Sequence, residues 1–317
     1  MKKKNFLWVE EYRPSKIDDC ILPESIKKVF TGFLEQGEIP HLLLSGSAGI
    51  GKTTVARALC EELGCSVLEI NGSDEGRLID TLRNKISQFA TTKSLTNRGK
   101  HKVVIIDEAD NTSDTVQLSL RHAMEEYSGN CRFILTCNYP NRIDDALHSR
   151  CTTVAFSIRK EDAQNMQVQF FSRLEDILKE KSIEYDRALL AKVVQRYYPD
   201  WRKLIMEVQR YCSTGKLEPV VLADVADIDL STLVSALKNK DYSTCRRWVV
   251  ENLNNDSAIL FRKLYDEIAV ETVMFKKCIP ELVLLIAEYS RDLDTIPDHQ
   301  INFDAFLIRV MMSCEFK

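Results

Sequence analysis

A glycine-rich segment, Gly46 to Thr53, constrains most narrowly what this chain can fold into. It reads Gly-Ser-Ala-Gly-Ile-Gly-Lys-Thr and fits the G-x-x-x-x-G-K-T pattern of a phosphate-binding loop, or P-loop. An apolar run at residues 41–45 precedes it, and residues 54–63 follow with helical spacing that ends at Gly64. The motif requires a strand, a loop and a helix in this order. The simpler alternative is a glycine-rich turn between a strand and a helix.

The loop predicts an anion site in which individual residues have distinct tasks. Its glycines let the backbone aim N–H groups at phosphates, and the helix N-terminus adds partial positive charge. Lys52 is expected to reach the β- and γ-phosphates, and the Thr53 hydroxyl to bind Mg²⁺. The predicted cofactors are therefore ATP and Mg²⁺. The predicted loop contacts to the nucleotide are Gly46, Ser47, Ala48, Gly49, Ile50, Gly51, Lys52, Thr53 and Thr54.

A second strong signal is the run Val-Val-Ile-Ile at residues 103–106, which is followed by acidic residues. Consecutive β-branched residues are typical of a parallel strand buried on both faces, and such sheets place ligands at the carboxyl ends of their strands. Asp107 is expected to hold Mg²⁺, mostly through its water shell. Glu108 is expected to polarise the attacking water. The alternative is a strand that ends in a charged turn.

Further strands are expected at residues 66–70, 132–138 and 152–156. Asn138 ends one of them and can hydrogen-bond a γ-phosphate or its water, or can simply open the turn before Pro140. Arg150 precedes the last strand. It is either a surface charge or a finger that reaches the γ-phosphate of a neighbouring subunit.

Beyond Ser157 the apolar residues recur only at the spacing of amphipathic helices. Asp200 is expected to cap a helix that runs through Tyr211, and Ser213-Thr214-Gly215 marks a domain edge. The other expected helices are residues 160–181, 187–197, 231–239, 242–253, 257–270, 275–291 and 303–313.

The charge balance argues against a nucleic-acid-binding protein that is basic over its whole surface. The net charge is −4, so DNA contacts must come from a local patch or a composite surface. No apolar run approaches the ~20 residues of a membrane span, and the basic start lacks the apolar region of a signal peptide. The ten cysteines form no C-x-x-C pair, which favours reduced thiols of a cytosolic protein over zinc or disulfides.

Residues 7–14, Leu-Trp-Val-Glu-Glu-Tyr-Arg-Pro, place an exposed Trp8–Tyr12 pair near the terminus. The segment either packs over the flat face of a nucleotide base and hydrogen-bonds the edge of that base, or simply packs along the surface of the first domain.

Taken together, seven segments in this order and spacing resemble the AAA+ ATPase subunits of sliding-clamp loaders. Two branches are close, the small subunits of replication factor C and the large subunit of T-even-phage clamp loaders, and the helical tail looks more like the phage branch. The motifs span about residues 7–210. The segments are Trp8–Pro14, the P-loop, Asn71–Glu75, Asp107–Asp110, Thr136–Asn138, Ser149–Cys151 and Pro199–Arg202.

The resemblance assigns roles that the residues alone leave open. It implies that Tyr12, Arg13 and Pro14 lie beside the adenine. It makes Asn138 the sensor 1 residue, Arg150 a finger supplied in trans, and Arg202 a sensor 2 residue that touches nucleotide in cis. The implied catalytic set is Lys52, Glu108, Asn138, Arg150 and Arg202. Pro199 replaces the usual glycine before sensor 2, so the local turn is expected to differ.

The family touches DNA phosphates with the N-terminal ends of two helices, which here begin near Gly76 and Ser113. Arg77, Arg83 and Arg121 are therefore candidates for contact with primer–template DNA, and phosphate contact is independent of sequence. The alternative is that these arginines are solvated helix charges.

The resemblance also implies a hydrophobic plug, Phe89-Ala90, that enters a pocket on the sliding clamp. The alternative is that Phe89 belongs to the core, because it is in register with Ile86.

The implied fold is α/β: an AAA+ P-loop NTPase with three domains. Residues 1–157 would form the nucleotide-binding domain with a five-stranded parallel sheet and an N-terminal arm on the adenine side. Residues 158–215 would form a helical lid, and residues 216–317 an all-helical collar for oligomerisation. Four ATPase copies and one small subunit would surround ATP sites at their interfaces, open the clamp and load it on primer–template DNA. The expected location is the cytoplasm at replication forks, the host's in the case of a phage.

Three other functions compete with this one. The letters Asp-Glu-Ala-Asp at residues 107–110 suggest a helicase, but the helical C-terminal third offers no second ATP-binding domain. An intact Lys52, Thr53, Asp107 and Glu108 argue against a non-catalytic stator subunit. Another AAA+ DNA-dependent ATPase, such as a branch-migration motor or an initiator, remains the alternative.

Overall fold

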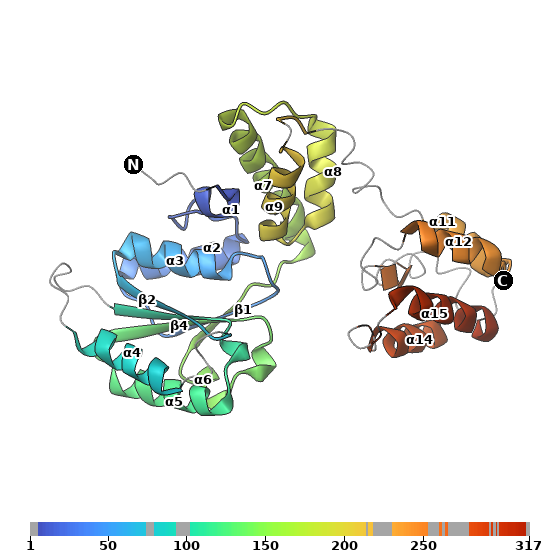
Figure 1. Ribbon diagram of the computed structural model, residues 1–317. Coiled ribbons are helices and arrows are strands. Elements are labelled where there is room, and N and C mark those ends of the chain that lie inside the picture. Colours follow the sequence, from blue (N-terminus) through green and yellow to red (C-terminus); the bar gives the residue numbers. More distant parts are fainter. Residues whose placement is uncertain are drawn as a thin grey trace. The chain divides into compact units, whose positions relative to one another are not determined.

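The computed structural model describes residues 6–73, 79–92, 102–213, 215–217, 230–252, 260–261, 264–265, 279–291, 293, 296 and 298–314. The chain divides into two compact units, Met1–Val225 and Ala226–Lys317 (Figure 1). The expected domain edges at 157/158 and 215/216 lie inside the first unit and stay predictions. None of the described helices is long and apolar enough to span a membrane.

The first unit contains the predicted five-stranded parallel sheet, which is confirmed. Its strand order is β2-β3-β4-β1-β5, and every neighbouring pair is parallel. β1 thus lies between β4 and β5, and the carboxyl ends of β1, β3 and β4 share one edge of the sheet. The strands are β1 (Leu42–Ser45), β2 (Ser66–Asn71), β3 (Lys102–Asp107), β4 (Cys131–Cys137) and β5 (Thr152–Ala155).

Helices cover both faces of the sheet (Figure 1). α2 (Glu24–Gln36) and α3 (Lys52–Leu63) lie on one face; α4 (Ile79–Thr91), α5 (Asp114–Glu126) and α6 (Asp145–His148) lie on the other. Alternate residues of each strand serve the two layers. Leu42 and Leu44 pack with α2 and α3, whereas Leu43 packs with the layer of α4 and α5. This burial on both faces explains the continuous apolar runs in the sequence.

The helical end of the first unit consists of α7 (Lys160–Glu180), α8 (Arg187–Tyr197) and α9 (Trp201–Tyr211), which we call the lid. Asp200 caps α9 as predicted, since its Oδ1 accepts a hydrogen bond from the Lys203 N–H at 2.9 Å. Ser113, near which a helix was expected to begin, is the N-cap of α5, but its side chain makes no capping hydrogen bond.

The expectation that Trp8 is exposed is wrong. The short helix α1 (Trp8–Glu11) packs on α9, Trp8 is only 7% exposed, and its ring belongs to the apolar core of the lid. Its backbone N–H donates to Gln209 Oε1 at 3.0 Å. The N-terminal segment is therefore anchored to the lid, about 200 residues away along the chain.

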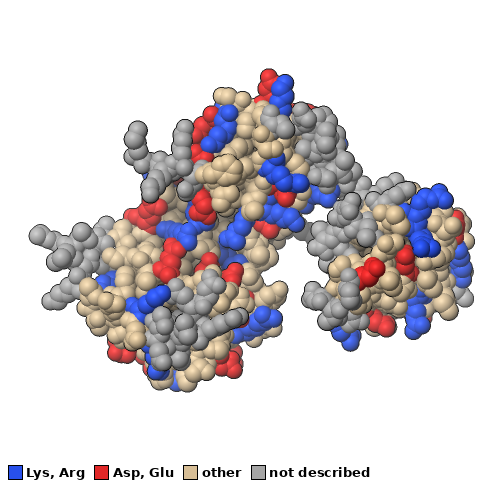
Figure 2. All heavy atoms as spheres, viewed as in Figure 1, with Lys and Arg blue, Asp and Glu red and all other residues tan. Residues whose placement is uncertain are grey.

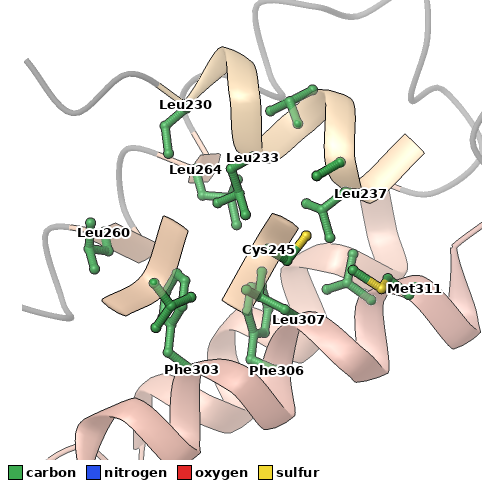
Figure 3. Packing of buried hydrophobic residues seen from close by; sticks show 14 of the residues in the cluster. Leu230, Leu233, Leu237, Cys245, Leu260, Leu264, Phe303, Phe306, Leu307 and Met311 are labelled. Atoms are coloured by element: carbon green, nitrogen blue, oxygen red, sulfur yellow. The ribbon is translucent and has the colours of Figure 1, made fainter. Parts of the chain in front are cut away.

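The second unit is helical, with α11 (Ser231–Lys238), α12 (Tyr242–Asn252), α14 (Ile279–Arg291) and α15 (His299–Ser313). In Figure 3, Leu237, Cys245, Phe306 and Leu307 point toward one another in a shared apolar core. α15 begins four residues before the predicted 303, because Asp298 caps it by accepting from the N–H groups of Gln300 and Ile301. Most of the helix expected at 257–270 lies outside the described residues.

The described cysteines are free thiols, and most of them are buried. Among the described residues, no group of three or more His, Cys, Asp or Glu side chains is arranged to hold a metal ion. On the face of the molecule shown in Figure 2, basic and acidic side chains are interspersed over each unit rather than gathered in one basic stripe.

Candidate functional site

One pocket collects residues that are far apart in the sequence. It lies where the carboxyl ends of β3 and β4 meet the start of α3, the N-terminal segment and the lid. It gathers most of the predicted nucleotide contacts. Its lining includes Tyr12, Arg13, Pro14, Ala48, Gly49, Ile50, Gly51, Lys52, Thr53, Thr54, Asp107, Glu108, Asn138 and Arg202, together with Thr136, Phe170, Arg173 and Trp201.

The P-loop has the backbone that phosphate binding requires. Gly46, Gly49 and Gly51 all have positive φ, at 153°, 75° and 97°. A side chain at Gly46 would also collide, because a Cβ there would lie 2.6 Å from Ile50 Cδ1. These positions thus need glycine for conformation and, at Gly46 and Gly49, also for space.

Lys52 lies folded back into the loop. Its Nζ donates to the Gly46 carbonyl at 2.9 Å and the Ser47 carbonyl at 2.8 Å, and to Asn138 Oδ1 at 2.8 Å. Lys52 is only 7% exposed, and burial lowers the pKa of its ammonium below the ordinary value. The same group thus lies between the P-loop and the predicted sensor at the end of β4.

The Thr53 hydroxyl and the Asp107 carboxylate meet at the end of β3. Thr53 Oγ1 donates to Asp107 Oδ1 at 2.6 Å, and Thr136 Oγ1 donates to the same oxygen at 2.5 Å. A hydroxyl and a carboxylate are oxygen ligands of the kind that Mg²⁺ prefers. The residues predicted for the metal therefore lie together and fit it chemically.

Glu108 is held by residues that the sequence analysis did not select. It has a left-handed backbone, φ 55°, and its N–H donates to Thr136 Oγ1 at 3.1 Å. Its Oε2 accepts hydrogen bonds from the Ser73 hydroxyl and from Asn111 Nδ2, the latter at 3.2 Å. Ser73 belongs to one of the quoted motif segments, which was the available signal. Thr136 likewise belongs to the quoted segment Thr136–Asn138, whereas Asn111 looks like an ordinary polar residue in the sequence.

Asp110 fixes the backbone that carries the predicted sensor. Its Oδ2 accepts from the N–H groups of Asn138 at 3.0 Å and Tyr139 at 2.9 Å, and the residue is only 5% exposed. Asp110 is the last letter of the acidic run after β3, but it received no role from the sequence. Its position in the short helix η1 (Ala109–Asn111) places its carboxylate within hydrogen-bond distance of the backbone that directly follows β4.

Another part of the pocket wall comes from the N-terminal segment and the lid. The Tyr12 carbonyl accepts from Arg173 Nη2 at 3.4 Å, and Arg13 pairs with Glu10. Trp201 stacks on Phe170 with ring centroids 4.3 Å apart. Arg202, next to it in α9, lines the same pocket.

Arg150 is not among the described residues that line this pocket. Its Nε donates to Glu125 Oε1 at 2.9 Å and its Nη1 to the Ala146 carbonyl at 2.8 Å, and its side chain is 32% exposed. The guanidinium lowers the pKa of the Glu125 carboxyl. Arg150 is thus held at the surface, away from its own chain's P-loop.

The arginines predicted to touch DNA differ in their surroundings. Arg77 lies outside the described residues. Arg83, on α4, is exposed and donates to Ser119 Oγ of α5 at 2.8 Å. Arg121 is half-buried on α5, and its Nε has no hydrogen-bond partner among the described residues. The two described arginines therefore lie on adjacent, mutually packed helices.

The predicted plug needs a correction at Ala90. Ala90 is 1% exposed and packs in the core beside Ile86, so its side chain offers no surface. Phe89 is half-buried against the same core, and Lys102 Nζ lies 5.4 Å from its ring centroid. Phe89 thus has both a packed side and an accessible side.

Comparison with known proteins matches two parts of the chain to family models. Residues 42–158 match the model for the ATPase family associated with various cellular activities (AAA). Residues 162–223 match the model for the AAA+ ATPase lid domain of the sliding-clamp-loader large subunit.

Relatives extend the likeness over most of the chain. The sliding-clamp-loader large subunit of Enterobacteria phage T4 is 38% identical over 252 residues, 78% of each protein. That of Escherichia phage RB69 is 36% identical with the same coverage. A replication factor C small subunit of Staphylothermus marinus is 31% identical and covers 96% of this chain and 94% of the relative. A solved structure of a Thermotoga maritima RuvB mutant, at 17% identity and a TM-score of 0.51, covers 72% of this chain and 80% of its own and shares the fold.

Proposed function

This chain belongs to the sliding-clamp-loader family of AAA+ ATPases, and we propose that it opens a sliding clamp and places it on primer–template DNA. ATP binding would order the assembly and hold the clamp open. Hydrolysis would then release the loader and leave the closed clamp behind.

The observation that carries the proposal is the convergence of Lys52, Asp107 and Glu108 at one edge of the sheet. Phosphoryl transfer needs positioned charge more than covalent chemistry. Lys52 supplies a cation at the phosphate loop, and Glu108 supplies a carboxylate that can accept a proton from water. Asn138 is held beside Lys52: its Oδ1 accepts from Lys52, and its backbone N–H donates to Asp110.

We propose Mg²⁺ as the metal of this site. Thr53 Oγ1 and Asp107 Oδ1 would hold it, directly or through water. The ion would supply charge neutralisation between the phosphates. Thr136 keeps the Asp107 carboxylate oriented toward Thr53.

The pocket is expected to be completed by a second copy of the chain. Arg150 is held by Glu125 and does not line its own pocket within the described chain, which supports a role on a neighbour's γ-phosphate. An arginine supplied in trans stabilises the charge of the transferring group. The assembly would contain four ATPase copies and one small subunit.

The clamp and DNA would bind outside the pocket. Arg83 and Arg121, with Arg77, would contact DNA phosphates from α4 and α5, independently of sequence. Phe89 would enter the clamp, without the contribution first expected of Ala90. Such an assembly would work in the cytoplasm at replication forks.

The test is steady-state ATP hydrolysis by the purified assembly alone, with a sliding clamp, with DNA, and with both. The proposal predicts that clamp and primer–template DNA together raise the rate many-fold above either one. A rate driven by DNA alone, with no effect of the clamp, would instead indicate a branch-migration motor or an initiator on the same fold.

A further inference from the structure

The P-loop is bonded to the lid through one glycine. The backbone N–H of Trp201, the first residue of α9, donates to the Gly49 carbonyl at 3.1 Å. The first N–H groups of a helix have no partner inside that helix. A carbonyl of the phosphate-binding loop therefore satisfies one of them at the start of the lid helix that carries Arg202.

Asp200 lies against the same glycine. It is the N-cap of α9, and its Oδ1 accepts from the Lys203 N–H at 2.9 Å. A Cβ built on Gly49 would lie 1.8 Å from that oxygen and 2.4 Å from Asp200 Cγ. Non-bonded carbon atoms prefer separations of about 3.5–4.0 Å. Even a methyl group at position 49 would therefore displace the Asp200 carboxylate that caps α9, or move the start of the helix with it.

The contact is specific to Gly49 among the P-loop glycines beside the lysine. Gly51 also has positive φ, 97°, but no described atom outside its immediate neighbours lies within 4 Å of a Cβ built there. Both positions thus have a positive φ that favours glycine, but of the two only Gly49 lies against a residue of the lid. This difference supplies a matched control.

We propose that Asp200 is a positioning residue: it seats the start of α9 on Gly49 and thereby sets how far Arg202 stands from phosphates bound by the P-loop. The inference rests on the proposed contact of Arg202 with nucleotide. Arg202 is two residues from Asp200 in the same first turn, so a shift of the helix start moves both together. A misplacement of 1 Å in a catalytic site can cost roughly 10²-fold in rate.

The first test separates positioning from folding. Asp200→Gly removes the whole side chain, and because glycine is itself a favoured N-cap residue, little stability is lost. In the purified assembly with clamp and DNA, kcat is expected to fall about tenfold or more, with little change in the thermal midpoint. Asp200→Asn keeps both the bulk and the cap and is expected to restore kcat. An Asp200→Gly variant with wild-type kcat would overturn the proposal.

The second test asks whether Asp200 acts through Arg202 and Gly49. In the Arg202→Ala background, Asp200→Gly is expected to have no further effect on kcat. Gly49→Ala should weaken binding of a non-hydrolysable ATP analogue by roughly tenfold more in the wild-type background than in the Asp200→Gly background. The Gly51→Ala loss should be equal in both. Equal Gly49→Ala losses would overturn the proposal.

The nucleotide role of Arg202 and the positioning role of Asp200 are tested separately by these variants. If Arg202→Ala itself leaves kcat unchanged, the proposed nucleotide role of Arg202 is wrong, and the positioning role falls with it. If Arg202→Ala lowers kcat but Asp200→Gly lowers it further by an independent factor, only the positioning role is wrong.

Discussion

Replacing Thr136 by valine tests whether one buried hydroxyl holds both acidic residues of the site. Thr136 is 2% exposed. Its Oγ1 donates to Asp107 Oδ1 at 2.5 Å and accepts from the Glu108 N–H at 3.1 Å. Valine has nearly the same shape, so the change removes these two hydrogen bonds and preserves most of the packing.

The magnitude follows from the two bonds. A hydrogen bond to a charged group contributes about 1.5–3 kcal/mol, and an N–H left buried without a partner costs about 1–3 kcal/mol. Asp107 keeps its bond from Thr53, so the free energy of unfolding is expected to fall by about 2–4 kcal/mol. Because Glu108 also loses its backbone anchor, kcat is expected to fall roughly tenfold to 10²-fold.

The assay combines urea unfolding of the full chain with kcat of the purified assembly. Thr136→Ser is the matched control, since it keeps the hydroxyl and loses one methyl group. It is expected to retain near-wild-type kcat and to lose about 1 kcal/mol of stability. The reasoning is refuted if the valine variant matches wild type in both measurements, or if serine and valine lower kcat equally.

Four further predictions address separate parts of the account. Glu108→Gln should bind ATP and clamp without turnover, because an amide is not a base; normal steady-state hydrolysis would remove Glu108 from the mechanism. Arg150→Ala should lower hydrolysis by up to ~10³-fold while its own pocket still binds ATP, and an isolated monomer as fast as the assembly would contradict a role in trans. Phe89→Ala should weaken clamp binding in a fluorescence titration. A stability loss of about 3–5 kcal/mol would show instead that Phe89 is a core residue. His41 Nδ1 accepts from the Phe133 N–H at 3.1 Å, and burial lowers the His41 pKa below 6.5. Between the folded and unfolded pKa values the unfolded chain binds more protons, so stability should fall as pH drops below 6.5. Urea midpoints at pH 7.5 and 5.5 check this, and a His41→Gln variant should lose less on acidification.

The sequence was most informative where function and backbone geometry coincide. The P-loop needs glycine at fixed positions, and Asp107 and Glu108 follow a strand buried on both faces, so local pattern alone placed them at the sheet edge. The apolar runs indicated buried strands, one of them parallel, and the family resemblance implied a sheet of five. These features depend on neighbours within about ten residues, which is the range over which sequence periodicity is readable.

The missed features depend on partners that are distant in the chain. Trp8 was expected to be exposed, but it is buried because Gln209 and the lid core receive it. Asp110 orients the predicted sensor across 28 residues. Nothing in the local pattern distinguishes either residue from an ordinary surface aromatic or acid. Ala90 failed as a surface residue because the side of α4 that carries it faces the sheet.

The most direct measurement of the central claim is the transfer of clamp to DNA. Labelled sliding clamp, primed circular DNA, ATP and catalytic amounts of the assembly would be mixed, and the DNA-bound clamp separated by size. The account predicts several clamps retained on DNA per loader for the wild type. The Glu108→Gln assembly should retain at most one clamp per loader, with the loader still attached. A wild-type assembly that hydrolyses ATP but leaves no clamp on the DNA would contradict the account.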